Sequence, residues 1–211
     1  MADLVLIGRQ SSHYTRVARI FALELGLSPR FQPIYQLMST DQTLFGDNPA
    51  LKLPILMIDG QPLYGTLNIC RQLAREAGAM NEIYWPELAG SLLQMNAHEL
   101  VAHAMAAQVE VVAHEFVQQR PADEVSSKRR HSLLATLAWL DSRWPEITAG
   151  LPPCRLSFLE TSLFCLLSHF PFRNPIDLVP YPRLNAFSER FDQRHSAAIT
   201  AYCFDQPAAA G

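Results

Sequence analysis

Two short segments of this 211-residue chain carry residue types suited to binding an acidic peptide. The first contains Leu53 and Pro54, directly before an apolar run at 55–58 that predicts a buried strand. Because proline cannot donate a ladder hydrogen bond, it belongs at the first residue of a strand or at a sheet edge. An X-Pro bond there can be cis, which turns the preceding backbone out of the sheet. We therefore expect the Leu53 N–H and C=O to be free to pair with an extended peptide.

The second segment follows a few residues later. Asp59-Gly60 predicts a two-residue hairpin turn into a strand at 61–64. Thr66 then takes the position of an N-cap at the start of the next helix. The free N–H groups of a helix N-terminus attract a carboxylate. An unpaired backbone edge beside such a helix start predicts a site for a small acidic peptide.

These features, together with the turn before the first helix, resemble the cytosolic glutathione transferases. Residues 9–20 read Arg-Gln-Ser-Ser-His-Tyr-Thr-Arg-Val-Ala-Arg-Ile, which is similar to that family's Ser-Pro-Tyr-Val-Arg pattern followed by an Arg-Ile pair. Aligning Arg19-Ile20 with this pair places Ser12 at the family's catalytic serine and His13 at its usual proline. Ser11 is the alternative to Ser12, because the register could slip by one residue.

The resemblance implies a chemical role for Ser12. In this family glutathione reacts as a thiolate, whereas a free thiol has a pKa of about 8.5. A hydroxyl donor and the positive end of a helix dipole both favour the anion. Ser12 would therefore stabilise the thiolate without acting as the nucleophile and without needing a base beside it. The alternative role is structural, since a serine in this position can serve only as the helix N-cap.

The resemblance also implies glutathione-binding roles for the two segments described first. Leu53 and Pro54 would hold the cysteinyl backbone of glutathione. Thr66 would bind its γ-glutamyl carboxylate, and Lys52 its glycyl carboxylate. The family usually has Glu or Gln before the threonine, whereas this chain has Gly65, which offers only backbone atoms. A hydrogen bond to a charged group contributes about 1.5–3 kcal/mol, so its loss would weaken glutathione binding roughly 10- to 100-fold.

The family's electrophile pocket lies between the first domain and a long helix of the second. His13 and Tyr14 at the first turn, with His98 and His103 on the long helix, are therefore the candidate contacts for an apolar electrophile. The two histidines of the long helix do not form a zinc-protease motif. Such a motif needs histidines at i and i+4, whereas these lie five residues apart, about 140° around the helix axis. We expect no metal site.

The elements that position these residues fall into two domains. Residues 1–78 show the order βαβαββα, which predicts a thioredoxin-like domain with one mixed sheet. Strands are expected at 4–7, 31–35, 54–58 and 61–64, helices at 14–25 and 66–77, and an irregular or short helical stretch at 38–47.

A linker at 79–86 leads to a second domain at 87–211, where the sequence pattern is helical and no strand is expected. Helices are expected at 87–119, 122–144, 157–168 and 182–191. Pro145 should end the second of these. Ser157 and Glu160 form a capping box at the start of the third. The second domain is therefore predicted to be an all-helical bundle, and the fold class α/β plus all-α.

Composition restricts the class of protein further. Apolar residues make up 49% of the chain, enough for a sizeable core, and the formal net charge of −3 favours neither nucleic acid nor an anionic membrane as partner. We find no signal-peptide pattern and no run of about 18 apolar residues, so no membrane segment is expected. The four cysteines lack metal or redox spacing, which indicates a reduced, cytoplasmic protein.

The resemblance to the cytosolic glutathione transferases implies the function of a glutathione transferase involved in detoxification. It would add glutathione thiolate, the co-substrate, to a small hydrophobic electrophile, and it would act as a homodimer. Gly65 and His13 leave open a non-catalytic binding or regulatory protein of the same fold with weak glutathione affinity. A glutathione-dependent isomerase is a third possibility, because Ser11-Ser12 resembles the Ser-Ser-Cys start of the zeta class, although His13 stands in place of the cysteine.

Overall fold

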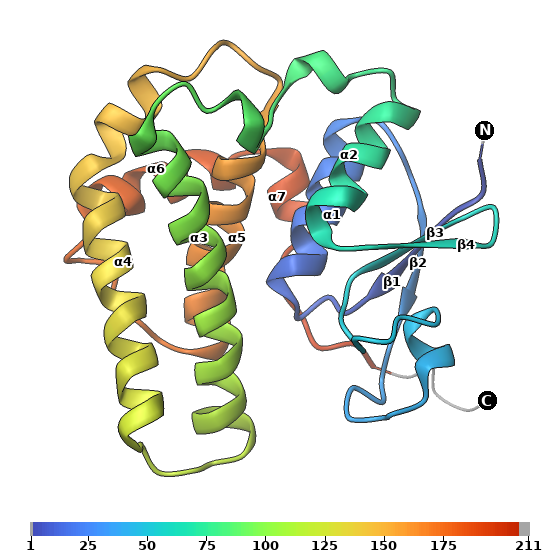
Figure 1. Cartoon of the computed structure of the whole chain (residues 1–211), viewed down its shortest axis with the longest axis horizontal. Helices are drawn as coiled ribbons and strands as arrows, with labels where there is room; N and C mark the ends of the chain where they lie inside the picture. The colour runs from blue at the N-terminus through green and yellow to red at the C-terminus, as the bar shows by residue number, and fades with distance from the viewer. Residues whose placement is uncertain (1, 207–211) are drawn as a thin grey trace. The chain divides into compact units, whose positions relative to one another are not determined.

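The computed structural model describes residues 2–206, which divide into two compact units. Among the described residues, the first unit holds 2–82 together with 195–206, and the second holds Ile83–Arg194. The division differs from the expected second domain of 87–211, because residues 195–206 pack with the first unit. Figure 1 shows the first unit in blue to teal, with the returning C-terminal segment in red.

The first unit is built on a four-stranded mixed sheet with the strand order β2-β1-β3-β4. Strands β1 (Leu4–Gly8) and β2 (Arg30–Pro33) are parallel and joined by α1 (His13–Glu24). Strand β3 (Ile55–Ile58) pairs antiparallel with both β1 and β4 (Gln61–Tyr64). This arrangement confirms the predicted thioredoxin-like order of elements.

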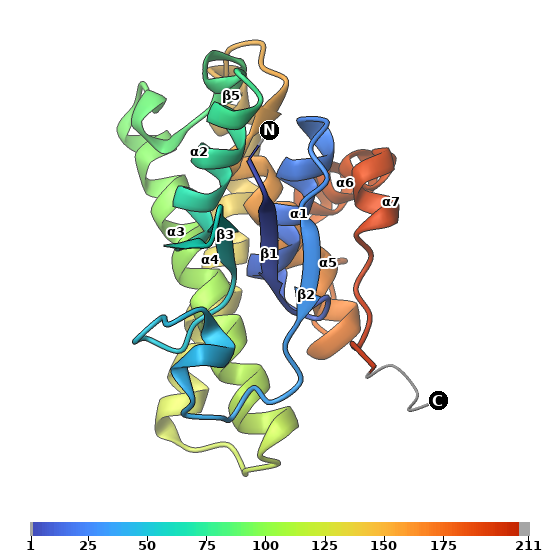
Figure 2. The ribbon, with the colours of Figure 1, turned by 90° about the vertical axis from the view of Figure 1, so that its right-hand side faces the viewer.

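The two faces of this sheet are covered differently. Helices α1 and α2 (Thr66–Glu76) lie side by side on one face (Figures 1 and 2). On the other face, the short 3-10 helix η1 (Gln42–Phe45) buries Phe45 against apolar side chains of β1 and β3. The expected short helix in the stretch 38–47 is therefore a single 3-10 turn.

The hairpin between β3 and β4 has the predicted two-residue turn. Asp59 and Gly60 both have positive φ, at 49° and 80°, as a type I′ turn requires. The turn is also tied to the start of β1, since Asp59 N–H donates to the Asp3 C=O at 3.0 Å. The hairpin therefore fixes the pairing of β3 with β4.

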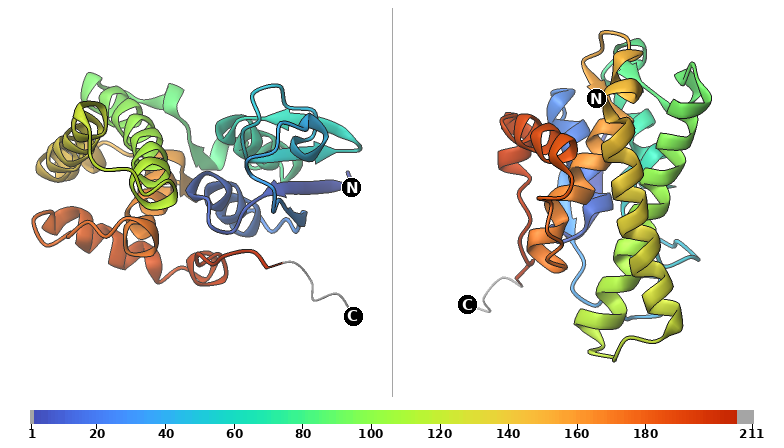
Figure 3. Two further views of the ribbon diagram at one scale, coloured as in Figure 1. Left: turned by 90° about the horizontal axis from the view of Figure 1, so that it is seen from below. Right: turned by 90° about the vertical axis from the view of Figure 1, so that its left-hand side faces the viewer.

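The C-terminal segment of the chain returns to the first unit. Helix α7 (His195–Ile199) lies beside α1, and the chain runs on to residue 206 (Figures 2 and 3). The buried Arg16 side chain of α1 donates to the Ala197 C=O at 3.0 Å and to the Thr200 hydroxyl at 3.3 Å. Its guanidinium also lies 4.4 Å from the centre of the Tyr202 ring. The sequence analysis placed the last helix at 182–191 and missed this return.

The second unit is helical apart from one pair of two-residue strands. Its helices are α3 (Leu92–Val111), continued by a π-helical turn at Val112–Val117, α4 (Glu124–Ala149), α5 (Phe158–Arg173) and α6 (Pro182–Asp192), and two 3-10 turns flank its start at Met80–Glu82 and Pro86–Leu88. The strands β5 (Ile83–Tyr84) and β6 (Leu156–Ser157) are parallel and were not expected. The helical content confirms the all-α part of the predicted fold class.

The prediction that Pro145 ends a helix was wrong. Pro145 lies inside α4, which continues to Ala149. Trp144 and Ile147 are buried on either side of it, so core packing offsets the hydrogen bond that a proline removes. The Thr148 hydroxyl also donates to the Trp144 C=O at 2.9 Å. By contrast, Ser157 caps α5 as predicted, accepting from the Glu160 N–H at 3.3 Å.

Within residues 2–206, one helix is long and apolar enough to cross a membrane, namely Leu92–Val117. The sequence analysis expected no such stretch. A single helix of this kind is weak evidence for a membrane protein, because the core helices of water-soluble proteins meet the same criterion. Ala97, Val101 and Met105 of this helix are buried within the folded protein.

Candidate functional site

Ser12 occupies the N-cap of α1. Its backbone is extended (φ −97°, ψ 125°), and its Oγ accepts a hydrogen bond from the Thr15 N–H at 3.3 Å. A hydroxyl has one donor and two acceptor positions, so capping uses a lone pair and leaves the O–H available as a donor. The capping role and the predicted donor role are therefore compatible in one side chain.

The turn before α1 is packed closely against the first turn of the helix. Ser12 N–H donates to the Arg9 C=O at 3.1 Å, and Arg9 N–H donates to the Thr15 hydroxyl at 3.4 Å. A Cβ at Gly8 would lie 2.5 Å from Thr15 Cγ2, a separation that real Cβ atoms essentially never show. Only glycine allows β1 to approach the helix this closely.

The neighbours of Ser12 lie in different surroundings. Ser11 is partly exposed in the same turn but is not the N-cap. His13, expected to line an electrophile pocket, is only 1% exposed, and its ring packs 4.6 Å from that of Tyr14. Tyr14 is partly exposed, and burial of its hydroxyl raises the pKa of this phenol. Of the two rings, that of Tyr14 is the one open to a ligand.

Leu53 lies where the sheet ladder ends. The Leu53–Pro54 bond is cis, and the pairing of β3 with β1 and β4 begins at Ile55. Among the described residues, neither the N–H nor the C=O of Leu53 has a hydrogen-bond partner. The backbone edge that the sequence predicted is therefore present.

The loop before Leu53 is held by a residue that the sequence analysis missed. Asn48 is 5% exposed, donates from Nδ2 to the Lys52 C=O at 2.9 Å, and accepts from the Ala50 N–H at 3.0 Å. The Lys52 side chain is exposed. A local signal existed, because asparagine in a loop commonly bonds its own backbone two residues on.

At the start of α2, the prediction for Thr66 was wrong by one residue. Gly65 is the N-cap and Thr66 the first helical residue. Gly65 has φ of +86°, a conformation that glycine adopts at little cost, which explains why the chain turns into the helix there. The N-cap makes no side-chain hydrogen bond, and no described group accepts from the N–H groups of residues 66–68. This helix start is therefore open to an anion.

The strand register brings these three segments to one end of the sheet. Ile55, which follows Pro54, is paired with Ile7 of β1 and with Tyr64 of β4. The turn after β1, the Leu53 edge and the start of α2 consequently extend from neighbouring strand ends. A hydroxyl donor, an unpaired backbone edge and an open helix start thus lie close together, a combination that suits a short peptide with an acidic end.

The two candidate histidines of the second unit lie on α3. His103 is exposed, with its Nε2 3.0 Å from the carboxylate of Glu99. His98 lies 5.7 Å from the Tyr84 ring, and its burial lowers the pKa of the imidazole to about 4. Their role in an electrophile pocket stays a prediction. The part of the chain that the structure describes contains no cluster of three or more His, Cys, Asp or Glu residues able to hold a metal ion.

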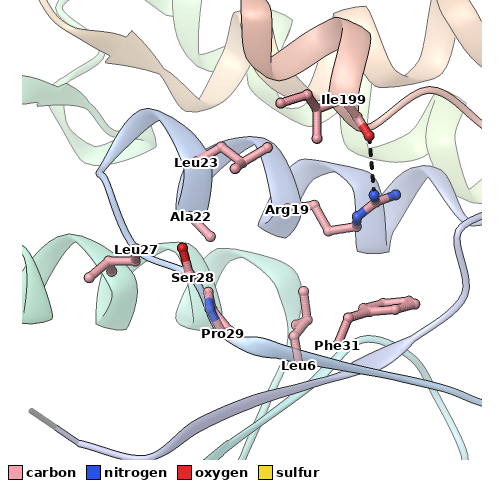
Figure 4. Close-up of a pocket in the computed structure, with 9 residues that line it drawn as sticks. All are labelled: Leu6, Arg19, Ala22, Leu23, Leu27, Ser28, Pro29, Phe31 and Ile199. Carbon is pink, nitrogen blue, oxygen red and sulfur yellow. Dashed lines mark hydrogen bonds between the residues drawn. The ribbon is translucent and has the colours of Figure 1, made fainter.

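A separate hollow of about 200 Å³ lies in the first unit (Figure 4). It is bounded by Leu6, Arg19, Ala22, Leu23, Leu27, Ser28, Pro29, Phe31 and Ile199. The Arg19 guanidinium lies 5.5 Å from the Phe31 ring centre and donates to the Ile199 C=O at 3.4 Å. None of the residues predicted for the site lines this hollow.

Comparison with known proteins gives a family match within the first unit. Residues 6–81 match the family model described as "Glutathione S-transferase, N-terminal domain". A search of curated proteins finds no match. A glutathione S-transferase from Methylobacillus flagellatus with bound glutathione has a similar structure, with a TM-score of 0.78, 20% identity, and coverage of 95% of this chain and 100% of that chain.

Two further solved structures are also similar to this chain over nearly its whole length. A glutathione transferase family member from Pseudomonas fluorescens, with bound glutathione, has a TM-score of 0.76 at 22% identity, covering 95% of this chain and 99% of its own. A glutathione S-transferase from Methylobacterium radiotolerans, in complex with glutathione sulfonate, has a TM-score of 0.75 at 21% identity. The similarity covers 98% of this chain and 97% of that chain. At these identities the likeness concerns the fold.

Proposed function

Because this chain has a glutathione S-transferase N-terminal domain and the fold of that family, we propose that it is a glutathione transferase. It would bind glutathione at the end of the sheet where β1 and β4 end and β3 begins. The reaction would join the glutathione sulfur to an electrophilic carbon of a small apolar molecule. Glutathione-bound structural neighbours support the choice of this peptide over others.

The observation that carries the proposal is the junction of Ser12, Leu53 and the start of α2. The unpaired N–H and C=O of Leu53 suit the backbone of a cysteinyl residue. The open N–H groups of α2, with the Thr66 hydroxyl beside them, suit a carboxylate. The cysteinyl backbone and the γ-glutamyl end would then be held by groups other than the hydroxyl that meets the sulfur.

Ser12 would stabilise the glutathione thiolate, which is the nucleophile of the reaction. Its Oγ accepts from the Thr15 N–H, which orients the side chain, and its O–H would donate to the glutathione sulfur. That hydrogen bond favours the thiolate, as does the positive end of the α1 dipole, so a larger fraction of thiol would be ionised near neutral pH. The sulfur forms the new S–C bond, the thiol proton passes to solvent, and the leaving group of the electrophile departs with the electron pair of the broken bond, as chloride does from a chloronitrobenzene.

The exposed side chain of Lys52 would meet the glycyl carboxylate of the peptide. An exposed ion pair contributes only about 0.2–1 kcal/mol, so Lys52 would be the weakest of these contacts. Tyr14, His98 and His103 are the proposed contacts for the electrophile. Cytoplasmic location and homodimer formation belong to the same proposal, and light scattering of the purified protein tests the dimer.

A second function is favoured by Gly65. This N-cap offers no side chain to the γ-glutamyl end, so the affinity for glutathione would be lower than in a relative with Glu or Gln. In that case the protein would bind an apolar ligand or a protein on this fold without turnover. The buried position of His13 does not distinguish this function from the enzyme.

Calorimetric titration with glutathione, followed by turnover assays with a chloronitrobenzene, tests the proposal. We expect binding at millimolar concentration or below and measurable conjugate formation. Absence of binding at millimolar glutathione would reject the enzyme. Binding without turnover, for both the natural protein and Ser12→Ala, would favour the non-catalytic function.

A further inference from the structure

Asp205 of the returning C-terminal segment contacts the turn that carries Ser12. The Asp205 carboxylate accepts a hydrogen bond from the Gln10 N–H at 3.0 Å, and its Oδ2 lies 3.9 Å from Nε of Arg9. The Asp205 side chain is only 2% exposed. A residue 195 positions along the sequence therefore supplies the partner of a backbone group in the 9–12 turn.

Contacts other than those of Asp205 also attach the segment to the first unit. The Arg16 side chain already holds the segment through Ala197, Thr200 and Tyr202. Moreover, Oδ1 of Asp205 is buried without a hydrogen-bond partner among residues 2–206. A buried carboxylate with one unsatisfied oxygen costs free energy. Holding the C-terminal segment on the first unit does not by itself explain why an aspartate is buried at this position.

We propose that Asp205 is a positioning residue for the turn 9–12 and, through it, for Ser12. The Ser12 N–H donates to the Arg9 C=O, so these residues and Gln10 form one hydrogen-bonded turn. The carboxylate accepts from the Gln10 N–H of this turn, while the Thr15 hydroxyl accepts from the Arg9 N–H. The part of the proposal that concerns Ser12 rests on the proposed function, whereas the part that concerns the turn does not.

Amide hydrogen exchange at Gln10 tests the turn directly. Asp205→Ala removes the acceptor, and we expect exchange at the Gln10 N–H to accelerate about tenfold or more. Asp205→Asn keeps an oxygen acceptor of the same shape, so exchange should stay within about threefold of the natural protein. Unchanged exchange in Asp205→Ala, or equal acceleration in both variants, would overturn the proposal.

The dependence of kcat/KM on pH tests the effect on Ser12. In Asp205→Ala a displaced hydroxyl would stabilise the thiolate less, so the rise of kcat/KM should move to higher pH and kcat should fall about tenfold. The KM for glutathione should change less than about twofold, because the Leu53 edge and the α2 start are untouched. Asp205→Asn should restore both the pH profile and kcat.

Ser196→Ala is the matched control for loosening of the segment. Ser196 donates to the Glu24 carboxylate at the opposite end of α1, so this variant weakens the return without touching the turn. We expect a lower Tm. The exchange rate of the Gln10 N–H and the pH dependence of kcat/KM should equal those of the unsubstituted protein. The proposal fails if Ser196→Ala reproduces the effects of Asp205→Ala. If the natural protein binds no glutathione, the proposed function fails, while the exchange data still decide whether Asp205 holds the turn.

Discussion

The two helices that begin at the proposed site have opposite kinds of N-terminus. At α1, the Ser12 side chain caps the helix, and backbone N–H groups of the preceding turn donate to Thr15 and to Asp205. At α2, Gly65 is the N-cap and no side chain caps the helix. The first start is closed by the protein itself, whereas the first N–H groups of the second have no acceptor among the described residues.

This difference fits the two tasks that a glutathione site must perform. A donor to sulfur must be held in one direction, because the stabilisation of a developing charge depends on a fixed donor. A carboxylate can be bound by several N–H groups at once, so an open helix start suffices. Removal of the Ser12 side chain should therefore lower both turnover and stability, and removal of the Thr66 hydroxyl at the start of α2 should lower mainly affinity.

The largest effect is expected for Ser12→Ala. Loss of the donor should lower kcat/KM about 100-fold, as for the loss of one donor to a developing anion in other enzymes. Loss of the cap should lower the free energy of unfolding by about 1 kcal/mol. Steady-state kinetics and chemical denaturation measure the two quantities.

Ser12→Asp separates these two roles. Aspartate is a good N-cap, so stability should be kept, but its carboxylate would repel a thiolate and turnover should still be lost. Natural turnover in Ser12→Asp would show that Ser12 is only a cap.

A smaller effect is expected for Thr66→Val. The change keeps the shape of the side chain and removes the hydroxyl, so the Kd for glutathione should rise about tenfold. Because Thr66 is not the N-cap, the free energy of unfolding should change by less than about 0.5 kcal/mol. Calorimetry gives the affinity. A loss of stability as large as that of Ser12→Ala would contradict the comparison between the two helix starts.

Gly65→Gln should change affinity and stability in opposite directions. A Cβ at this position would meet only Nδ2 of Asn68, at 3.6 Å, so there is space for the side chain. A polar group beside the carboxylate site should tighten glutathione binding up to about tenfold. The φ of +86° should cost about 1–3 kcal/mol of stability. Unchanged affinity in a folded Gly65→Gln would show that residue 65 does not face the ligand.

The smallest effect is expected for Ser11→Ala. Ser11 lies in the same turn as Ser12 but does not cap α1, so kcat/KM should stay within about threefold of the natural value. Side-by-side kinetics of the two alanine variants measure this. A larger loss for Ser11→Ala than for Ser12→Ala would move the donor role to Ser11 and shift the sequence register by one.

Features determined by neighbouring residues were predictable from the sequence. The Asp59-Gly60 pair predicted the hairpin, the apolar run at 55–58 predicted the strand, and Pro54 predicted the free edge at Leu53. In each case residues within about ten positions set the geometry. The sheet of the first unit and the helices α1 and α2 were therefore predictable from the sequence, whereas the return of 195–206 was not.

Features that depend on distant contacts were not predictable. Pro145 remains helical because buried neighbours stabilise α4, and helix signals in sequence do not include such packing. The return of 195–206 depends on Arg16 and Gln10, nearly two hundred residues away.

One local feature was also missed. The cap of α2 was assigned to Thr66 because residue type favours threonine there, whereas the positive φ at the turn requires Gly65.

A crystal structure of the protein with glutathione tests the central claim most directly. The account predicts that the sulfur lies within about 3.5 Å of the Ser12 hydroxyl, with the cysteinyl backbone paired to Leu53 and a carboxylate at the start of α2. Glutathione bound elsewhere, or bound here with its sulfur directed away from the 9–12 turn, would contradict it.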